Sequence, residues 1–371
     1  MAGIDKSNWQ TKPNNEWSFV NVDKLLDTQV IRKSSTPTPA FPSSSEKLDS
    51  FKVTLGKQEQ DLAALLALTE TDAFVVLHKG KLVHEYFAHG NDATSKHILM
   101  SVTKSITALV IGRLVEQGAL DTEAKVSRYI PELKGTPYEH VTVRHCLDMR
   151  AGIDYEDGAS HEYRMAVGTD PPHKGEKQTT FLDFLKGFDA PTTTPGGEFK
   201  YLSVNTDVLG LVCERASSKK LSDLISEYVM QPAGAENDAL MTVDSAGAPR
   251  AAGGMCASVY DLARVGLGII SGSVISESWL QDTLSGGDTE AFAKGAFAGF
   301  AAGRKTTAYR SCWTADSEEE TMIALGVFGQ MLAVDLKNGI VVAKTSSQAD
   351  RVAQVPTGVM CFHSVRRALL G

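Results

Sequence analysis

Residues 100–118 read MSVTKSITALVIGRLVEQG. The apolar residues of this stretch cover most of a helical circumference, and Gly118 can supply a left-handed cap at its C-terminal end. A helix that is apolar all round lies inside a protein rather than on its surface. The stretch therefore predicts a buried central helix with Ser101 and Lys104 in its first turn.

Ser101 and Lys104 have a spacing that suits proton transfer. Residues three apart on a helix face the same way, so the Lys104 amine can reach the Ser101 hydroxyl. Burial disfavours the charged form of an amine, which lets Lys104 act as a base near neutral pH, and the positive end of a helix stabilises an alkoxide at Ser101. From these residues alone, a helix-capping serine followed by a lysine that extends to solvent is an equally good explanation.

The same S-x-x-K spacing occurs twice more, at Ser44/Lys47 and at Ser217/Lys220. The first lies in an irregular Ser- and Pro-rich arm over residues 34–47, and the second lies in a polar turn. Neither opens an apolar helix, so only the pair in the central helix is a candidate for catalysis.

Strand patterns lie at both ends of the chain, and helical patterns lie between them. The expected elements are a hairpin over 73–90 that turns at Lys79-Gly80, a helix over 259–270, strands over 321–327 and 331–335, a turn at Asn338-Gly339 into IVVAKTSS, and a helix near 359–370. This order predicts an α/β (α+β) fold in which a sheet is built from both termini and a helical lobe is inserted. We expect residues 1–97 and 261–371 to form the sheet domain and residues 98–260 to form the mainly helical domain.

The composition excludes several kinds of partner and indicates a cellular location. With a formal net charge of -8 the chain has no broad basic surface, so nucleic acid and anionic membranes are not expected partners. No apolar run is long enough to span a bilayer, and the polar N-terminus lacks a secretory signal. The five scattered cysteines form no CxxC pair, which indicates a cytoplasmic protein. We expect a small-molecule substrate, and a homodimer is left open.

Several familiar catalytic and binding motifs are absent, and a histidine pattern that looks like a metal site has the wrong spacing. The chain has no GxSxG elbow, no phosphate-binding GxxxxGK and no GxGxxG. His84-Glu85 and His89 form HExxxH rather than a metalloprotease motif, and in a strand the two histidines would point to opposite faces. His145 invites comparison with a Ser-His-Asp triad, but we expect it to be structural.

Four ordered motifs resemble the serine β-lactamase-like hydrolases, in particular the 6-aminohexanoate-dimer hydrolases. They are MSVTKSITALVIGRLVEQGALD (100–121), GGEFKYLSVNTDVLGLVCERASS (196–218), AAGGMCASVYDLARVGLGII (251–270) and ALGVFGQMLAVDLKNGIVVAKTSS (324–347). The resemblance spans nearly the whole chain. It implies a β-lactamase/D-Ala-D-Ala carboxypeptidase-like fold with an antiparallel sheet, and it implies neither a metal nor an organic cofactor.

The resemblance also assigns roles to residues. Ser101 is the nucleophile, Lys104 its base, and Tyr201 the group that passes a proton to the departing amine, with its pKa expected to be lowered beside a cationic lysine. The backbone N–H groups of Ser101 and Val327 form the oxyanion hole. Of the supporting residues, Ser203 and Asn205 belong to the hydrogen-bond network, and Gly326 lets substrate approach the strand closely.

Two departures bear on the substrate. Penicillin-recognising relatives carry Lys or His where this chain has Ala324, and the tyrosine motif reads Tyr-Leu-Ser rather than Tyr-x-Asn, so β-lactam hydrolysis is not expected.

The loop over 154–170 offers Arg164, which would favour neutral or anionic substrates if it faces the pocket, or would be a surface residue paired with Glu162.

Three aromatic residues are further candidates for the pocket, with core packing as the alternative for each: Tyr155, Tyr163 and Trp313. The predicted function is hydrolysis of small linear amides or esters through an acyl-enzyme. A carboxylesterase, a peptidase or a β-lactamase-like enzyme of the same fold is the main alternative, and a catalytically silent binding scaffold is the other.

Overall fold

Strands gather towards the two ends of the chain, and helices dominate its middle. The computed structural model describes residues 3–45, 48, 51–55, 58–158, 160–301, 303–352 and 355–371. In chain order the elements are α1 (Asn14–Ser18), η1 (Val22–Lys24), β1 (Thr28–Ile31), β2 (Lys52–Leu55), β3 (Gln58–Asp61), α2 (Leu62–Leu68), β4 (Thr71–His78), β5 (Lys81–Phe87), β6 (His97–Ile98), α3 (Val102–Glu116), α4 (Val126–Tyr129), η2 (Pro131–Leu133), α5 (Val143–Leu147), α6 (His161–Ala166), α7 (Phe181–Lys186), α8 (Ser203–Ser217), α9 (Leu221–Ile225), η3 (Ser226–Met230), β7 (Ala239–Thr242), β8 (Met255–Ala257), α10 (Val259–Ser271), α11 (Glu277–Ser285), α12 (Thr289–Lys294), η4 (Ala298–Ala301), β9 (Thr307–Arg310), β10 (Trp313–Asp316), β11 (Thr321–Gly326), η5 (Val327–Gly329), β12 (Gln330–Asp335), β13 (Ile340–Ser346) and α13 (Val355–Leu370).

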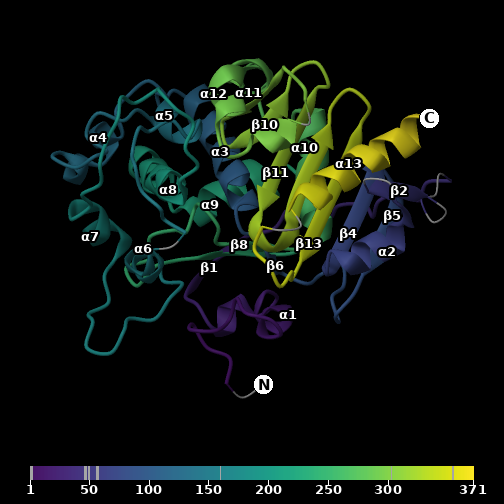
Figure 1. Cartoon of the computed structure of the whole chain (residues 1–371), viewed down its shortest axis with the longest axis horizontal. Coiled ribbons are helices and arrows are strands. Elements are labelled where there is room, and N and C mark those ends of the chain that lie inside the picture. Colours follow the sequence, from purple (N-terminus) through teal and green to yellow (C-terminus); the bar gives the residue numbers. More distant parts are fainter. Residues whose placement is uncertain are drawn as a thin grey trace.

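The largest sheet is antiparallel and has the strand order β5-β4-β13-β12-β11-β10-β9. β4 and β5 come from the first quarter of the chain and the other strands from its last fifth, so both ends of the chain build one sheet (Figure 1). Lys79 (φ 49°) and Gly80 (φ 76°) form the predicted tight turn between β4 and β5. The predicted α/β (α+β) fold class, with a helical region inserted in the chain, is confirmed.

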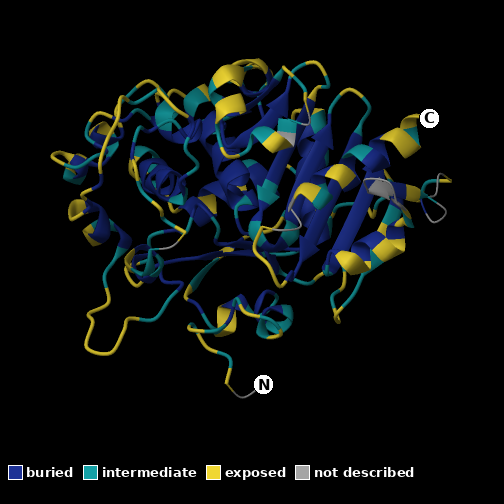
Figure 2. Ribbon diagram, viewed as in Figure 1, coloured by how far each residue is buried: buried dark blue, intermediate teal, exposed yellow. Residues whose placement is uncertain are grey.

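The large sheet is covered on both faces, which explains the unbroken apolar run in β4. Val75 and Leu77 belong to the core that contains α3 and α10, whereas Phe74 and Val76 belong to the core that contains α2 and α13. Alternate residues of a strand point to opposite faces, so a strand covered on both sides must be apolar at every position. Figure 2 shows the central strands buried along their length.

The predicted central helix is α3. Nearly all of its residues are buried, because it packs against α8 and α9 on one side and against β11 and β12 on the other. Gly118 follows the helix with φ 69°, the left-handed conformation expected there. The helix thus carries its first turn to the junction between the helical region and the sheet (Figure 1).

A second, smaller sheet with the order β1-β7-β8-β6 lies beside this junction. It pairs strands from both sides of the predicted domain boundary at residues 97/98, and β6 itself crosses that boundary. α10 packs against β4, β12 and β13 of the large sheet. The division into two domains therefore stays a prediction, and the small sheet ties the two parts together.

Some element ends differ from the sequence expectations. β11 ends at Gly326 because Val327 begins the short helix η5, and α13 begins at Val355 rather than near residue 359. In the 34–47 arm, Ser43 bridges to Leu82, and Lys47 lies outside the described residues. Among the helices of the described segments, none combines the length and apolar character needed to cross a membrane.

Candidate active site

Ser101 lies between β6 and α3, directly after a tight change of chain direction. The Leu99 N–H donates to the Met255 carbonyl at 2.8 Å, and Met100 adopts a φ of 46°. A left-handed conformation is costly for a residue with a side chain, by roughly 1 kcal/mol, and persists only where the surroundings enforce it. The Ser101 side chain makes no capping bond to α3, so the helix-capping explanation is wrong.

The Lys104 amine is buried and makes three contacts. Its Nζ lies 2.8 Å from Ser101 Oγ, 3.2 Å from Ser203 Oγ and 2.7 Å from the Ala252 carbonyl oxygen. The carbonyl can only accept, and a neutral amine has two N–H groups and one lone pair. Donation to Ala252 and Ser203 therefore leaves the lone pair free to accept the Ser101 proton.

The surroundings of Lys104 favour this neutral form. Lys104 is 1% exposed. Burial, assisted by the positive charge of Arg250, lowers the pKa of Lys104 to about 8, while Asp157 and Asp207 act in the opposite direction. About a tenth of the amine is thus uncharged at pH 7, far more than for an exposed lysine, and this neutral fraction can act as the general base.

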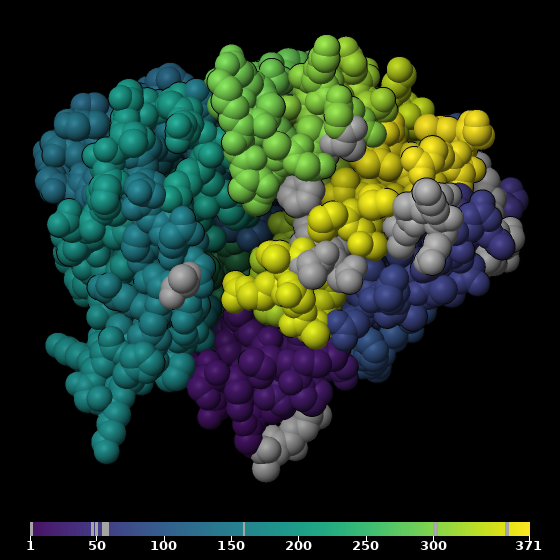
Figure 3. Space-filling model, viewed as in Figure 1, coloured from purple at the N-terminus to yellow at the C-terminus, as the bar shows by residue number. Residues whose placement is uncertain are grey.

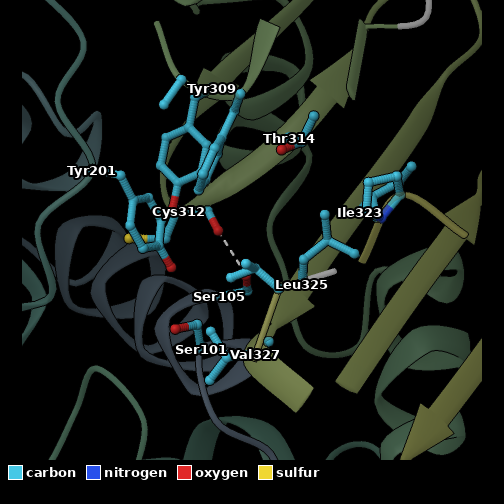
Figure 4. Close-up of a pocket in the computed structure, with 14 residues that line it drawn as sticks. Ser101, Ser105, Tyr201, Tyr309, Cys312, Thr314, Ile323, Leu325 and Val327 are labelled. Carbon is cyan, nitrogen blue, oxygen red and sulfur yellow. Dashed lines mark hydrogen bonds between the residues drawn. The ribbon is translucent and has the colours of Figure 1, made fainter. Parts of the chain in front are cut away.

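Tyr201 is the third residue of the predicted catalytic centre. Its pKa is raised, whereas we expected from the sequence that it would be lowered. Its ring centroid lies 5.0 Å from Lys104 Nζ, and its hydroxyl points toward Ser101 (Figure 4). Burial raises the pKa of Tyr201, and its hydrogen bond with Ser101 offsets only part of that rise. The prediction of a lowered pKa was wrong because desolvation outweighs the Ser101 hydrogen bond and the charge of Arg250, which both act to lower the pKa of Tyr201. Tyr201 therefore stays a neutral phenol.

Ser203, the first residue of α8, links this group to an acidic residue. Its hydroxyl accepts from Lys104, and its N–H donates to Asp157 Oδ2, which also accepts from the Val204 N–H at 3.2 Å. A carboxylate at this position satisfies the free N–H groups at the start of a helix. Asn205 lies deeper, where its Oδ1 accepts from Tyr138 at 2.8 Å, so it braces the helical core; the hydrogen bonds of Lys104 go to Ser101, Ser203 and Ala252 instead.

A buried ion pair lies behind the lysine. Asp207, fully buried in α8, pairs with Arg250 and accepts from the Tyr163 hydroxyl at 2.6 Å. Its second oxygen accepts from the Ala252 N–H at 2.8 Å. Because the Ala252 carbonyl accepts a hydrogen bond from the Lys104 amine, Asp207 holds in place the residue whose carbonyl orients the lysine.

The two predicted oxyanion-hole residues, Ser101 and Val327, come from different elements and line the same two cavities. The β11–β12 ladder ends at the pair Gly326 and Gln330, so Val327 lies just beyond the ladder. A Cβ at Gly326 would lie 2.8 Å from the Leu99 carbonyl oxygen. Gly326 thus allows β11 to approach the chain that leads to Ser101, in addition to any approach by substrate.

Two cavities meet at Ser101. One, of about 260 Å³, is mainly apolar and is lined by Phe297, Tyr309, Cys312, Ile323, Leu325 and Gly326 among others (Figure 4). The other, of about 280 Å³, is more polar and is called the polar cavity below; it is lined by Asp157, Arg164, Arg250, Arg351 and Ser203 among others. Four residues line both: Ser101, Tyr201, Val327 and Val352. Figure 3 shows the surface hollowed between the teal helical region and the yellow C-terminal segments.

Of the four residues predicted to line the substrate pocket, two line one of the cavities and two do not. Tyr163 and Arg164 line the polar cavity, whereas Tyr155 and Trp313 line neither cavity. Tyr155 packs against Phe188 at 4.8 Å between ring centroids, and Trp313 is 1% exposed. Core packing therefore explains both of these.

The Arg164 side chain has a different partner from the one we expected. Its Nε lies 2.8 Å from Asp170 Oδ2, and its Nη1 donates to the Gly158 carbonyl at 3.0 Å. The proposed pair with Glu162 was wrong, because residues two apart on a helix do not face each other.

The histidines lie outside the two cavities. His145 closes a capping box with Thr142 at the start of α5, which is the structural role expected for it. β5 ends at Phe87, so His89 lies beyond the strand and contacts Asp72 at 2.7 Å. The argument from opposite strand faces therefore does not apply to His89.

One group of metal-type side chains occurs within the described residues, namely His161, His173 and Glu176. The two imidazole rings stack with centroids 3.7 Å apart and planes at 20°. Lone pairs in the plane of nearly parallel rings do not converge on one ion. None of the three lines either cavity.

Sequence reasoning missed several residues at this site: Asp157, Asp207, Arg250, Phe297, Tyr309 and Arg351. For Asp207 a signal existed, because an acidic residue among the apolar positions of a helix requires a buried partner. The others lie in loops or strands where no periodicity marks them.

Comparisons with protein families, with known sequences and with solved structures point to the same family and fold. The beta-lactamase family matches residues 63–357 of this chain. The chain is 34% identical to the 6-aminohexanoate-dimer hydrolase of Paenarthrobacter ureafaciens over 92% of its own length and 88% of that protein. Over 37% of its length it is also 34% identical to esterase EstB of Burkholderia gladioli, covering 36% of that protein. A solved structure from Bacillus anthracis, provisionally named a 6-aminohexanoate-dimer hydrolase, superposes with a TM-score of 0.86 at 25% identity, over 99% of this chain and 96% of that one.

Proposed function

Because the chain belongs to the beta-lactamase family and is a serine hydrolase of that fold, we propose that Ser101, Lys104 and Tyr201 are its catalytic residues. Its substrates are small linear amides or esters, cleaved through an acyl-enzyme. One observation carries this proposal: a buried amine with a pKa of about 8 lies 2.8 Å from Ser101 Oγ, where two cavities meet.

The first step is attack by Ser101 on the carbonyl carbon. The neutral Lys104 amine takes the hydroxyl proton as the new C–O bond forms. The backbone N–H groups of Ser101 and Val327 stabilise the oxygen that becomes negative, and donors fixed in advance contribute a large share of such rate enhancements.

The second step is loss of the amine or alcohol. The leaving atom needs a proton as its bond to the carbonyl carbon breaks, and the neutral phenol of Tyr201 supplies it. The proton on Lys104 then restores the phenol. Water attacks the resulting ester with the same residues in the reverse roles and releases the acid. No cofactor enters the proposal.

The substrate class rests on the relatives and on the cavities. A relative that matches most of the chain is named for the 6-aminohexanoate dimer, a short linear amide, and another carries the name of an esterase. The apolar cavity suits a hydrocarbon segment. Ala324, at the position where penicillin-recognising relatives carry a lysine or histidine, argues against a β-lactam substrate. A carboxylesterase is the alternative that the esterase relative favours.

The test is release of primary amine from the linear 6-aminohexanoate dimer, with a p-nitrophenyl ester in parallel. Wild type is compared with Ser101→Ala, Lys104→Ala and, as a control, Ser217→Ala from the S-x-x-K pair at the end of α8. We expect Ser101 and Lys104 to be required for amine release and Ser217 to be dispensable. Ester turnover without amine release would keep the mechanism and reject the amidase assignment. No Ser101-dependent turnover of either compound would favour a silent scaffold.

We also propose a cytoplasmic location, because the five cysteines are free and buried. A homodimer is a further proposal, and light scattering of the purified protein tests it.

A further inference from the structure

Among the described residues of the polar cavity, one arginine forms no ion pair with a carboxylate. Arg164 pairs with Asp170, and Arg250 pairs with Asp207. Arg351, in contrast, donates to the side-chain oxygen of Gln10 at 3.2 Å and lies over the ring of Phe328 at 5.4 Å. In the part of the chain that the structure describes, no carboxylate forms an ion pair with it. Arg351 is exposed, so a ligand in the cavity can reach it.

The local field around Arg351 is positive. Partial burial and then the charges of Arg164 and Arg250 lower the pKa of Arg351, and these two outweigh the opposing effects of Asp170 and Asp157. The Asp157 carboxylate is directed at the N–H groups that begin α8. A bound anion would therefore lie in a favourable potential at this point.

A groove outside the polar cavity extends this positive region. It has a volume of about 520 Å³ and shares Arg164 and Arg351 with the polar cavity. Its other cations are Lys6 and Lys12, and Lys12 is paired with both Glu16 at 2.8 Å and Glu70 at 3.0 Å, so Lys6 is the cation that the groove adds. The whole chain has a formal net charge of -8, so this basic path to Ser101 is a local feature.

The positions of Tyr201 and Lys104, which supply the proton to the leaving group, indicate whether the leaving group or the acyl chain enters the polar cavity. A leaving amine takes up a proton at Tyr201, close to the Lys104 amine. Ser203, which is hydrogen-bonded to that amine, lines the polar cavity but not the apolar one. The leaving group therefore extends into the polar cavity, and the acyl chain occupies the apolar one.

Building on the proposed function, we propose that the leaving group ends in a carboxylate that pairs with Arg351. The substrates are then N-acyl amino acids, or the matching esters, with an uncharged hydrocarbon acyl chain. Ser101 Oγ forms a bond to the carbonyl carbon, the C–N bond breaks, and the amine takes the proton that Ser101 lost. Water then cleaves the acyl-enzyme, which gives a carboxylic acid and a free amino acid.

The test uses a matched pair of substrates, N-hexanoyl-6-aminohexanoate and its terminal carboxamide, which differ only in the charge at the end of the leaving group. Wild type, Arg351→Gln, Arg351→Lys and the exposed control Arg128→Gln are compared by kcat and KM. We expect wild type and the control to favour the carboxylate by about tenfold in kcat/KM, as one charge-assisted contact provides. Arg351→Gln should lose this preference through a higher KM for the carboxylate, and Arg351→Lys should retain part of it.

Two results would separate this inference from the proposed function. If Ser101-dependent cleavage persists but Arg351→Gln leaves the preference unchanged, the role of Arg351 is rejected and the serine hydrolase mechanism stands. If neither compound is cleaved, calorimetry of the same pair with Ser101→Ala and Ser101→Ala/Arg351→Gln decides. A preference for the carboxylate that depends on Arg351 supports the anion site, and equal binding by both variants overturns it.

Discussion

Lys104 Nζ lies 2.8 Å from Ser101 Oγ in a site where only 1% of the lysine is exposed. A charged amine cannot accept the serine proton, so the pKa of Lys104 decides the pH at which the enzyme works. That pKa is lowered to about 8 by burial and by Arg250.

Ester hydrolysis should therefore rise with pH to a plateau above about 8. Below the pKa the neutral fraction of Lys104 falls about tenfold per pH unit, and kcat/KM should fall in parallel. A stopped assay with a p-nitrophenyl ester between pH 6 and 10 measures this, with protein stability recorded at each pH. A profile that is flat from pH 6 upward would mean that Lys104 is not the base.

The ion pair of Asp207 and Arg250 should support both stability and catalysis. Asp207→Ala leaves Arg250 buried without its partner, which typically costs about 3–5 kcal/mol. It also removes the hydrogen bond that anchors Ala252, the residue whose carbonyl orients Lys104. Urea unfolding should show the loss, and kcat should fall in the fraction that remains folded.

The double variant Asp207→Leu/Arg250→Met is the control for this prediction. It removes both charges, so stability should recover in part while kcat stays low. If Asp207→Ala costs less than about 1 kcal/mol, the pair does not brace the site.

Sequence periodicity predicted the parts of this fold that local patterns determine. The apolar circumference of α3, the hairpin at Lys79-Gly80 and the strands after residue 321 each follow from neighbouring residues, and all are present. The small sheet was missed because β1 and β7 pair across more than 200 positions and are only four residues long. Strands this short carry too few residues for alternation to be recognised.

The candidate site was predicted unevenly for a related reason. Ser101 and Lys104 lie in one helical turn, so their contact can be worked out from spacing alone. The contact of Arg250 with Asp207 and the burial that raises the pKa of Tyr201 both depend on how distant segments pack. Likewise Arg164 pairs with Asp170 because the chain folds back after α6, and the Asp170 N–H donates to the Arg164 carbonyl at 3.2 Å.

Gly326 should tolerate no larger residue. Its φ of -130° suits any residue, but a Cβ would lie 2.8 Å from the Leu99 carbonyl oxygen and 2.9 Å from Gln330 Cβ. Gly326→Ala must push β11 away from the chain before Ser101, which should cost about 1–3 kcal/mol and lower kcat by shifting Val327. Gly299→Ala is the matched control, since nothing lies within 4 Å of its Cβ position. Equal kcat for the two variants would show that the approach of β11 is not critical.

Arg164 should influence substrate ranking less than Arg351 does, and in the same direction. It lines the polar cavity, but Asp170 offsets its charge at 2.8 Å. Arg164→Asp places a second carboxylate beside Asp170 and removes a cation near Arg351, so carboxylate-bearing substrates should lose several-fold in kcat/KM relative to neutral ones. Arg164→Lys keeps the charge and should keep the ranking. Since salt screens exposed charges, the difference between the two variants should shrink as ionic strength rises. A ranking that stays the same in Arg164→Asp would mean that this arginine serves only to tie Gly158 and Asp170 together.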